Sequence, residues 1–313
     1  MFHYMELSLT NWNKENKPAD VSSRLRGGSS SPGGKSPLPQ SLPDPDGHDA
    51  PGAVAETGTC ETGTLGKAVA LLDLVARAEN PPRFTDLLKL TGQPRGSLHR
   101  QLRHLVLEGL IDLSPDGAYT PGLRLLQFAS RAWARNSFRL VAEPHLTRLH
   151  EMTCETVHLG VLRECEIVYL DKIESRQAVR MHSQVGNSAP AYCTGVGKAA
   201  LACLVDEALQ TLTVRMSFNP YTQATLADAG ALVREIGEIR QRGFAFDMEE
   251  HQPAIRCVAA AIHAPEANIL GGISVTAPAF RAGPEQLEAW AAPVCAAARL
   301  IVADVARRLG PRR

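Results

Sequence analysis

The chain has 313 residues, of which 44% are hydrophobic and 21% charged, and its formal net charge at pH 7 is zero. This length allows two folded domains plus tails, and the hydrophobic content is sufficient for a buried core in each. A balanced charge argues neither for nor against binding to nucleic acid, so the local distribution of basic residues has to decide.

Cysteine usage and hydropathy predict the compartment. The seven cysteines show no CxxC spacing, which favours reduced thiols and a cytoplasmic location, and no metal or other cofactor is expected. The first twenty residues lack the apolar core of a signal peptide. No run approaches ~18 apolar residues, so no membrane span is expected.

Residues 1–60 are rich in Gly, Pro, Ser and Asp. Such a segment cannot bury enough apolar area to offset the entropy lost on ordering, and we predict a disordered tail.

Residues 61–122 predict three helices followed by a hairpin. The first helix is indicated by apolar residues at helical spacing before Asn80-Pro-Pro82, namely Leu65, Val69, Leu72, Val75 and Ala76. A short second helix spans 84–90 with Leu87 and Leu88 facing inward, and a turn containing Gly92 leads to a third helix over 94–108. Strands at 110–113 and 118–120, joined by a turn at 114–117, follow. This order of elements predicts a winged helix-turn-helix.

The third helix carries the predicted contacts to DNA. Pro94 suits its first position, and one side is apolar with Leu98, Leu102, Leu105 and Val106. The other side has no acid before Glu108 and carries donors suited to base edges and phosphates in a major groove. An ordinary solvated helix would show the same pattern, and it is the neighbouring elements that favour DNA binding. The candidate contacts are Arg95, Ser97, His99, Arg100, Gln101 and Arg103.

The rest of the chain predicts a linker and an α+β domain. Residues 123–137 are assigned to a linker helix, because the segment 121–133 has an apolar repeat on one side and is too polar on its other side for a core element. In residues 138–310 we expect helices at 144–152, 195–204, 226–242 and 285–309, and strands at 157–161, 167–170, 178–181, 244–246, 257–263 and 270–276. Strands that follow one another closely favour a largely antiparallel sheet.

With both halves considered, the chain resembles the IclR family of bacterial transcriptional regulators over roughly residues 64–309. The first domain carries Gly92-Gln-Pro-Arg-Gly-Ser-Leu-His-Arg100 and Gly109-Leu-Ile111. The second carries Glu155-Thr-Val-His-Leu159, Val168-Tyr-Leu-Asp-Lys172, Gly195-Val-Gly-Lys-Ala199, Gly243-Phe-Ala-Phe-Asp-Met-Glu-Glu250, Arg256-Cys-Val-Ala-Ala260 and Gly272-Ile-Ser-Val-Thr276. The resemblance implies a winged-helix DNA-binding domain and a GAF-like effector domain. It also implies a homodimer or homotetramer that binds a palindromic operator in double-stranded DNA.

A ligand site is expected around Gly195, where backbone N–H groups at a helix start suit a carboxylate. Tight packing of that helix on the sheet is the alternative explanation of these glycines. The segment is not a phosphate-binding Walker loop, because Ala199 replaces the Ser or Thr that would hold magnesium. The resemblance implies an effector pocket at Ala189, Pro190, Ala191, Gly195, Val196, Asp247, Cys257, Ser274 and Thr276.

Two residues depart from the family pattern. Tyr192 stands where histidine is common, which leaves the effector's identity open, and Gly96 stands where a serine or threonine is common in the recognition helix. We therefore expect a DNA-binding regulator controlled by a small organic acid, and no enzyme. The competing interpretations are an enzyme using Cys257 with nearby histidines, and a metal or redox sensor, but no catalytic motif or metal-ligand spacing supports either.

Overall fold

A computed structural model describes residues 63–177 and 183–310. The predicted tail at 1–60 and the predicted strand at 178–181 lie outside the described residues.

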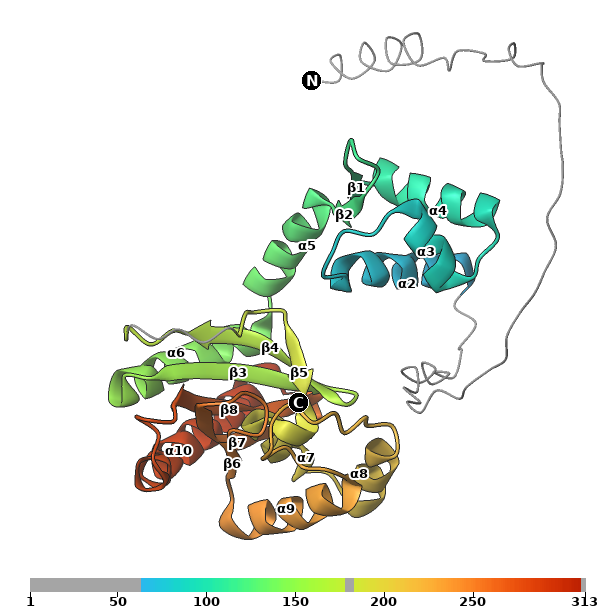
Figure 1. Cartoon of the computed structure of the whole chain (residues 1–313). Coiled ribbons are helices and arrows are strands. Elements are labelled where there is room, and N and C mark those ends of the chain that lie inside the picture. The colour runs from blue at the N-terminus through green and yellow to red at the C-terminus, as the bar shows by residue number, and fades with distance from the viewer. Residues whose placement is uncertain (1–62, 178–182, 311–313) are drawn as a thin grey trace, which may run out of the picture. The chain divides into compact units, whose positions relative to one another are not determined.

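The N-terminal elements form a winged helix-turn-helix, as predicted (Figure 1). Helices α2 (Gly63–Arg77), α3 (Phe84–Thr91) and α4 (Arg95–Leu107) are followed by the antiparallel strands β1 (Ile111–Leu113) and β2 (Tyr119–Pro121). Gly92 ends α3 with φ of 59°, a left-handed conformation that glycine adopts without strain. The turn between α3 and α4 therefore depends on this glycine.

The core of this unit differs in detail from the expectation. Its buried residues are Leu71, Val75, Leu87, Leu98, Leu102, Leu105, Ile111 and Tyr119. Of the apolar residues at helical spacing, Leu65 and Val69 are exposed, because Leu71 and Val75 supply the buried face of α2. Pro94 is the residue before the first turn of α4, not its first helical residue.

Two consecutive helices follow the winged helix-turn-helix. Helix α5 (Leu123–Ala134) has no buried residue, which fits the predicted linker. Helix α6 (Ser137–Thr153) begins seven residues before the predicted start at Pro144, because Asn136 caps it by accepting from the Arg139 N–H at 2.9 Å. Buried contacts on both sides of Pro144 hold the helix together across the hydrogen bond that proline cannot donate.

The C-terminal unit is built on a six-stranded antiparallel sheet in the order β5-β4-β3-β8-β7-β6. The strands are β3 (Thr156–Arg163), β4 (Glu166–Ile173), β5 (Ser188–Pro190), β6 (Ala245–Met248), β7 (Ile255–Ala264) and β8 (Ile269–Pro278). This confirms the predicted α+β class with an antiparallel sheet. Strand β5 and helix α8 (Asp206–Thr213) are additions that the sequence pattern did not predict.

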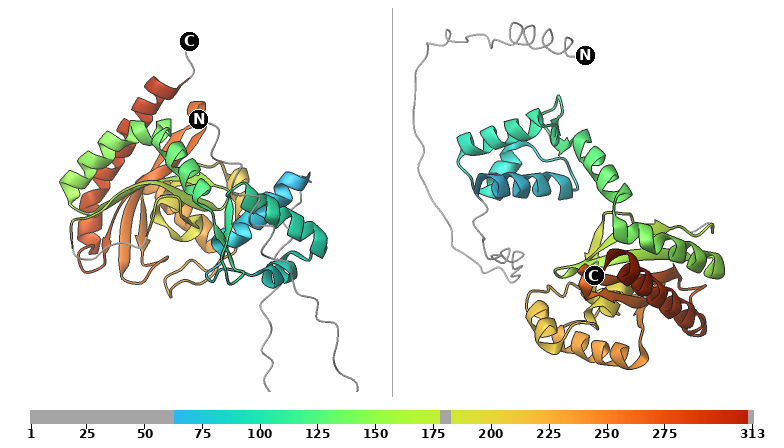
Figure 2. Two further views of the ribbon diagram at one scale, coloured as in Figure 1. Left: turned by 90° about the horizontal axis from the view of Figure 1, so that it is seen from above. Right: turned by 180° about the vertical axis from the view of Figure 1, so that it is seen from behind.

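Each face of the sheet is covered by its own helices (Figure 2). On one face, β3, β7 and β8 pack against α6 and α10 (Pro284–Leu309) around Leu159, Val258 and Val294. On the other, the sheet packs against a short 3₁₀ turn (Ala191–Cys193), α7 (Gly195–Leu201), α8 and α9 (Ala229–Arg242). Since side chains alternate along a strand, Ser274 and Thr276 on β8 point to the α7 face while Ile273 and Val275 point to the α10 face.

Helix α10 qualifies by length and composition as a possible membrane span, which the sequence analysis did not foresee. Eight of its residues, among them Leu287, Trp290 and Ile301, are buried in the core of the domain. A core helix of a folded domain satisfies the same criterion, and here α10 packs on the sheet.

Candidate functional site

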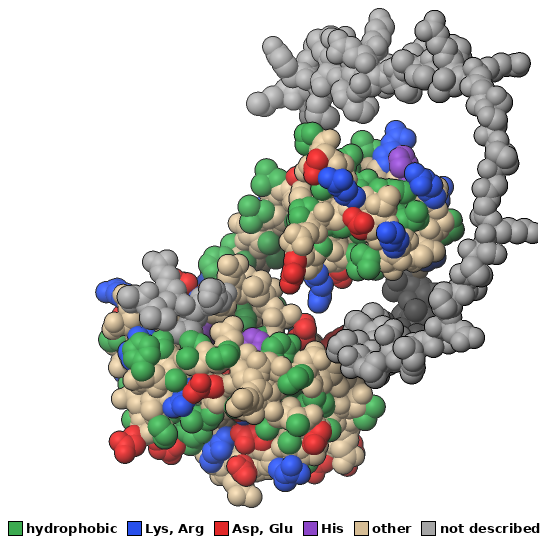
Figure 3. All heavy atoms as spheres, viewed as in Figure 1, with side chains coloured by type: hydrophobic (Ala, Val, Ile, Leu, Met, Phe, Trp, Pro, Cys, Tyr) green, Lys and Arg blue, Asp and Glu red, His purple; other side chains and the backbone are tan. Residues whose placement is uncertain are grey.

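The outward side of α4 carries most of the predicted DNA contacts. Arg95, His99, Arg100 and Arg103 are exposed and Ser97 is half-buried. In the space-filling view, Lys, Arg and His side chains gather over this helix (Figure 3). The α4 surface thus offers several donors and positive charge on one side.

Phe84, at the start of α3, holds two of these side chains in place. The guanidinium carbon of Arg95 lies 5.1 Å from the centre of the Phe84 ring, and the His99 ring meets the same ring edge-on at 6.2 Å. A cation above an aromatic face is attracted by its quadrupole, so Phe84 orients Arg95 before any contact with DNA.

Gln101 is the exception among the predicted contacts. The structure buries it, with 7% of its surface exposed, so its assignment to the outward side was wrong. Its position on the helix is at the border of the apolar side, and packing of α2 and α3 against α4 extends the buried side to include it. Its Oε1 has no hydrogen-bond partner among the described residues.

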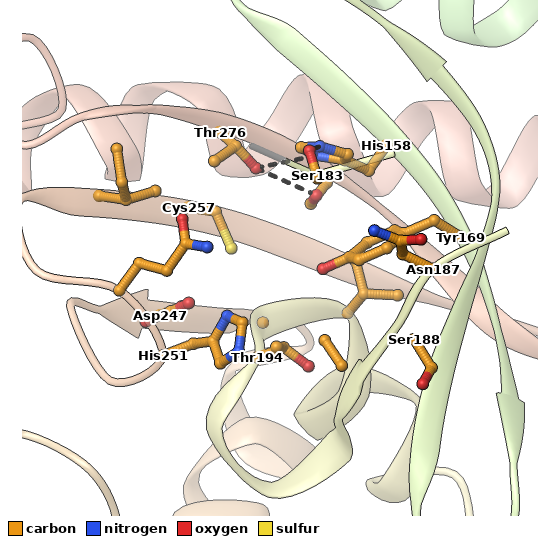
Figure 4. Close-up of a pocket in the computed structure, with 16 residues that line it drawn as sticks. His158, Tyr169, Ser183, Asn187, Ser188, Thr194, Asp247, His251, Cys257 and Thr276 are labelled. Carbon is orange, nitrogen blue, oxygen red and sulfur yellow. Dashed lines mark hydrogen bonds between the residues drawn. The ribbon is translucent and has the colours of Figure 1, made fainter. Parts of the chain in front are cut away.

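The second candidate site is a cavity of about 140 Å³ between the sheet and α7 (Figure 4). Seven of the nine predicted effector residues line it: Ala189, Gly195, Val196, Asp247, Cys257, Ser274 and Thr276. Pro190 and Ala191 do not line it. Ala191 is fully buried in the core beneath α7, and its N–H donates to the Cys165 carbonyl oxygen.

Nine further lining residues were not predicted from the sequence. They are His158, Tyr169, Ser183, Asn187, Ser188, Thr194, His251, Gln252 and Ile255. His158 and Tyr169 lie within the Glu155–Leu159 and Val168–Lys172 motifs, and alternation along β3 and β4 places both on the α7 face. These two residues could therefore have been predicted from the alternation of side chains along the strands.

Close packing of α7 on β7 shapes the floor of the cavity. A Cβ atom at Gly195 would lie 2.5 Å from the Cys257 Sγ, and one at Gly197 would lie within 2.4 Å of the Ala191 backbone. Thr194 caps α7 by accepting from the Gly197 N–H. The glycines therefore serve the tight packing that the sequence analysis gave as the alternative to ligand binding, and Gly195 also borders the cavity.

Asp247 forms the acidic end of the cavity. Only 7% of its surface is exposed, and its Oδ1 accepts from the Glu250 N–H at 2.8 Å. Burial, followed by the nearby charge of Glu250, raises the pKa of Asp247 to about 7. The Asp247 carboxyl is therefore partly protonated at neutral pH.

The nearest buried cation is committed to other acids. Lys198 on α7 is 1% exposed and donates to Glu250, and it lies 3.3 Å from the Oε1 of Glu235 on α9. Burial raises the pKa of Glu250, and the second carboxylate oxygen of that residue has no partner among the described residues. Lys198 thus holds the loop after β6 against α7, and Asp247 receives only a weaker effect of its charge.

Hydroxyl groups and a histidine form the opposite end of the cavity (Figure 4). The His158 Nδ1 lies 3.2 Å from the Thr276 Oγ1 and its Nε2 lies 2.7 Å from the Ser183 Oγ. The Ser274 Oγ lies 3.3 Å from the Thr276 Oγ1. Burial, assisted by the charge of Lys172, lowers the pKa of His158 to about 3, so the ring is neutral.

The remaining ionisable groups of the cavity are also uncharged. Burial raises the pKa of the Tyr169 hydroxyl and of the Cys257 thiol, and it lowers the pKa of His251. No Lys or Arg occurs among the lining residues that the structure describes. Apart from the partly protonated Asp247 carboxyl, the groups that would hold a ligand in this cavity are neutral donors and acceptors.

A larger hollow of about 600 Å³ lies on the other side of β3 and β4, next to the start of α6. Its described lining is mainly apolar, and Arg163 is the sole ionisable residue in it. The smaller cavity has the convergent buried polar groups that characterise a specific small-molecule site.

Family profiles cover both units of the chain. The profile described as "IclR helix-turn-helix domain" matches residues 64–114, and "Bacterial transcriptional regulator IclR C-terminal" matches residues 131–303. The chain belongs to the IclR family. It is a DNA-binding transcriptional regulator, as the sequence motifs indicated.

Curated IclR-family relatives match over most of their length. The HTH-type transcriptional regulator XynR of Escherichia coli is 33% identical over 211 residues, covering 67% of this chain and 84% of the relative. The transcriptional repressor IclR of the same organism is 27% identical over 252 residues, covering 80% and 92%.

Solved IclR-type structures share the fold. The IclR protein of Thermotoga maritima superposes with a TM-score of 0.58 at 28% identity, covering 79% of this chain and 99% of that chain. An IclR homologue from Microbacterium hydrocarbonoxydans, solved with 4-hydroxybenzoate, has a TM-score of 0.64 at 22% identity, covering 78% and 100%. The latter likeness shows the fold alone.

Proposed function

We propose that this regulator binds an operator in double-stranded DNA through α4, and that a small organic acid in the cavity beneath α7 modulates this binding. The observation that carries the proposal is the convergence of Asp247, Cys257, Ser274 and Thr276, which come from three strands, on one buried polar cavity. One IclR homologue of the same fold has been solved with 4-hydroxybenzoate, which is an example of a small organic acid.

The size and polarity of the cavity suit such a ligand. Its volume of about 140 Å³ is close to the ~150 Å³ that accommodates one benzene molecule. At one end the Ser274 hydroxyl, held by Thr276, can donate to a carboxylate. At the other end, protonated Asp247 can donate to a second oxygen of the ligand. An acid with two polar ends separated by a short apolar body fits this arrangement.

For the DNA contacts we propose Arg95, Ser97, His99, Arg100 and Arg103. Gln101 is left out because it is buried. We further propose that residues 61–122 form the DNA-binding domain, 123–137 the linker and 138–310 the effector domain. The protein would act as a homodimer or homotetramer in the cytoplasm, where its operator lies.

Catalysis at Cys257 is the competing function. A nucleophilic thiol needs a lowered pKa, whereas burial and the charge of Asp247 raise the pKa of this one. This raised pKa favours ligand binding over covalent chemistry.

The DNA-binding half is tested on α4. We expect Arg100→Ala to weaken binding to the promoter fragment beside the protein's own gene, and to cost about 1–3 kcal/mol of base discrimination if Arg100 reads a guanine. Fluorescence anisotropy at several salt concentrations measures both effects. Arg234→Ala on the exposed side of α9 is the matched control and should bind as the wild type does. Wild-type affinity of Arg100→Ala would remove Arg100 from the interface.

The effector half is tested with a panel of aromatic and aliphatic carboxylic acids. An acid that occupies the cavity should raise the melting temperature, because it binds the folded state alone, and should change operator affinity. In Asp247→Ala the response to the acid should be lost while DNA binding without acid is kept. Loss of both properties would show that Asp247 is needed for folding, and failure of every acid to bind would exclude this ligand class.

A further inference from the structure

The hydroxyl end of the cavity forms a continuous chain of hydrogen-bonding groups that ends at the ligand space. The chain runs from Ser183 through the His158 ring to Thr276 and then to Ser274, with separations of 2.7, 3.2 and 3.3 Å between successive heavy atoms. All four residues line the cavity. The register of the sheet produces this alignment, since His158 on β3 pairs with Ser274 on β8.

The ring at the centre of the chain is held firmly. His158 is 4% exposed, its ring packs against Tyr169 at 5.2 Å, and both of its nitrogens have hydroxyl partners. Lys172 is its register partner on β4 and donates to the Ser183 carbonyl oxygen at 2.7 Å. Burial, followed by this nearby positive charge, lowers the pKa of His158 to about 3, so the ring carries one N–H and one lone pair at physiological pH.

A neutral ring imposes one direction on the whole chain, because it donates from one nitrogen and accepts at the other. When Nδ1 carries the hydrogen, it donates to the Thr276 oxygen, the Thr276 hydroxyl donates to Ser274, and the Ser274 hydroxyl is left to donate to a ligand. When Nε2 carries the hydrogen, every bond reverses. Ser274 then donates to Thr276 and presents a lone pair to the ligand.

We propose that His158 is a specificity-determining residue of the effector cavity, whose choice of protonated nitrogen sets whether Ser274 offers a ligand a hydrogen or a lone pair. The Nδ1–H form suits a carboxylate or carbonyl oxygen, and the Nε2–H form suits a ligand hydroxyl. This inference rests on the cavity of the proposed function and adds to it the residue that selects the ligand's polar group.

The first test needs no ligand. In protein labelled with ¹⁵N-histidine, the nitrogen shifts of His158 report which nitrogen carries the hydrogen, and His158→Gln identifies its signals by their loss. Ser183→Ala leaves Thr276 as the hydroxyl partner of the ring and should favour Nδ1–H. Thr276→Val leaves Ser183 and should favour Nε2–H. The same form in both variants would overturn the proposal.

His150 serves as the internal control for these spectra. Its Nδ1 lies 2.8 Å from the Glu155 carbonyl oxygen, which can only accept, and it does not line the cavity. Its form should therefore stay Nδ1–H in both variants. A change at His150 that matched the change at His158 would show a general disturbance of the fold and would count against the proposed role of the hydrogen-bond chain.

The second test uses benzoate and phenol as probes. Saturating benzoate should shift His158 toward Nδ1–H, whereas phenol, whose hydroxyl can donate to Ser274, should shift it toward Nε2–H. By calorimetry, Thr276→Val should bind benzoate more weakly than Ser183→Ala does, because Ser274 loses the Thr276 hydroxyl whose donation turns the Ser274 hydrogen toward the carboxylate, whereas Ser183→Ala keeps that donor. Equal losses in the two variants would indicate a merely structural role for the chain.

These arms separate the two hypotheses. If the variants fix opposite forms of His158 but no acid of the panel binds, the organic-acid function fails and the hydrogen-bond chain stands. If benzoate binds and His158 keeps one form in every variant and with both probes, the proposed role of the hydrogen-bond chain is wrong and the proposed function stands.

Discussion

At the residue scale, the buried charged groups of the effector domain differ in whether they have an ion-pair partner. Lys198 pairs with Glu235 and Glu250, while Asp247, three residues before Glu250, receives a backbone N–H as its nearest described donor. An ionised carboxylate in such a place loses its hydration without gaining a full ion pair. The raised pKa of Asp247 expresses this cost.

Asp247→Asn should therefore change the pH dependence of stability. The folded-state pKa of about 7 exceeds the ordinary value of 3.8, so the wild type loses stability as pH rises from about 4 to about 7. The variant lacks this loss, and its free energy of unfolding relative to the wild type should rise across that window by on the order of 4 kcal/mol at most. Urea unfolding at pH 4, 5.5 and 7.5 measures it.

For Asp304→Asn, the pH dependence of stability should have the opposite sign. The hydrogen bond from His145 holds the pKa of Asp304 below its usual range, so its contribution to stability is present above about pH 4 and lost as pH falls. A relative stability of Asp247→Asn that did not vary with pH would show that Asp247 is ionised at no cost in the folded protein.

The sequence predicts residues of the site to the extent that they lie within a motif or a short strand pattern. Asp247, Cys257, Ser274 and Thr276 each belong to such a motif and all line the cavity. Asn187 and Ser183 do not, since their place depends on how the chain between β4 and β5 returns to the sheet. Gln101 shows where prediction from helical spacing fails. It lies at the border between the apolar and polar sides of α4, and whether such a residue is buried depends on the elements packed against the helix.

At the element scale, the contact between α7 and β7 sets the depth of the cavity. Gly195 begins α7 and lies against Cys257, and a Cβ atom added at Gly195 would also lie 3.3 Å from the Cβ of Ala259 on the same strand. The helix can approach the strand this closely because these residues are small.

Gly195→Ala should destabilise the effector domain by about 1–3 kcal/mol, because its methyl group would overlap the Cys257 sulfur. Cys257→Ala removes that sulfur, so the double variant should recover much of the loss. A double-mutant cycle from thermal or urea unfolding gives the coupling between the two sites. Additive effects in this cycle would mean that the helix moves away from β7 instead of clashing with the thiol.

Element boundaries were predictable where a local signal marks them. Gly92 ends α3 and Gly243 ends α9, both at positive φ. The start of α6 was misplaced because Pro144 resembles a helix start, whereas burial of Phe138 and Val141 on the sheet extends the helix before it. Strand β5 has three residues and exists through its pairing with β4, which no local pattern encodes.

At the scale of the whole molecule, a short set of contacts joins the end of the linker helix to the strand beside the cavity. The Trp133 indole N–H at the end of α5 donates to the Leu170 carbonyl oxygen at 2.7 Å. Arg139 stacks on the Trp133 ring at 4.0 Å and donates to Asp171 at 2.9 Å. The neighbouring residue on β4, Tyr169, lines the cavity. A ligand that moves this stretch of β4 would act on the last turn of α5.

Trp133→Phe should weaken this coupling while leaving both binding sites intact. The phenyl ring keeps the stacking of Arg139, and the Leu170 carbonyl loses its donor. The factor by which an acid changes operator affinity should move toward one, and linkage requires the factor by which operator DNA changes acid affinity to move equally. Anisotropy and calorimetry measure the two factors. Arg131→Ala, also exposed on α5, should leave both unchanged. A ligand can shift the equilibrium between two states of the protein only if it binds them with unequal affinity. Unaltered factors in Trp133→Phe would therefore mean that this difference reaches the DNA-binding domain by contacts other than this hydrogen bond.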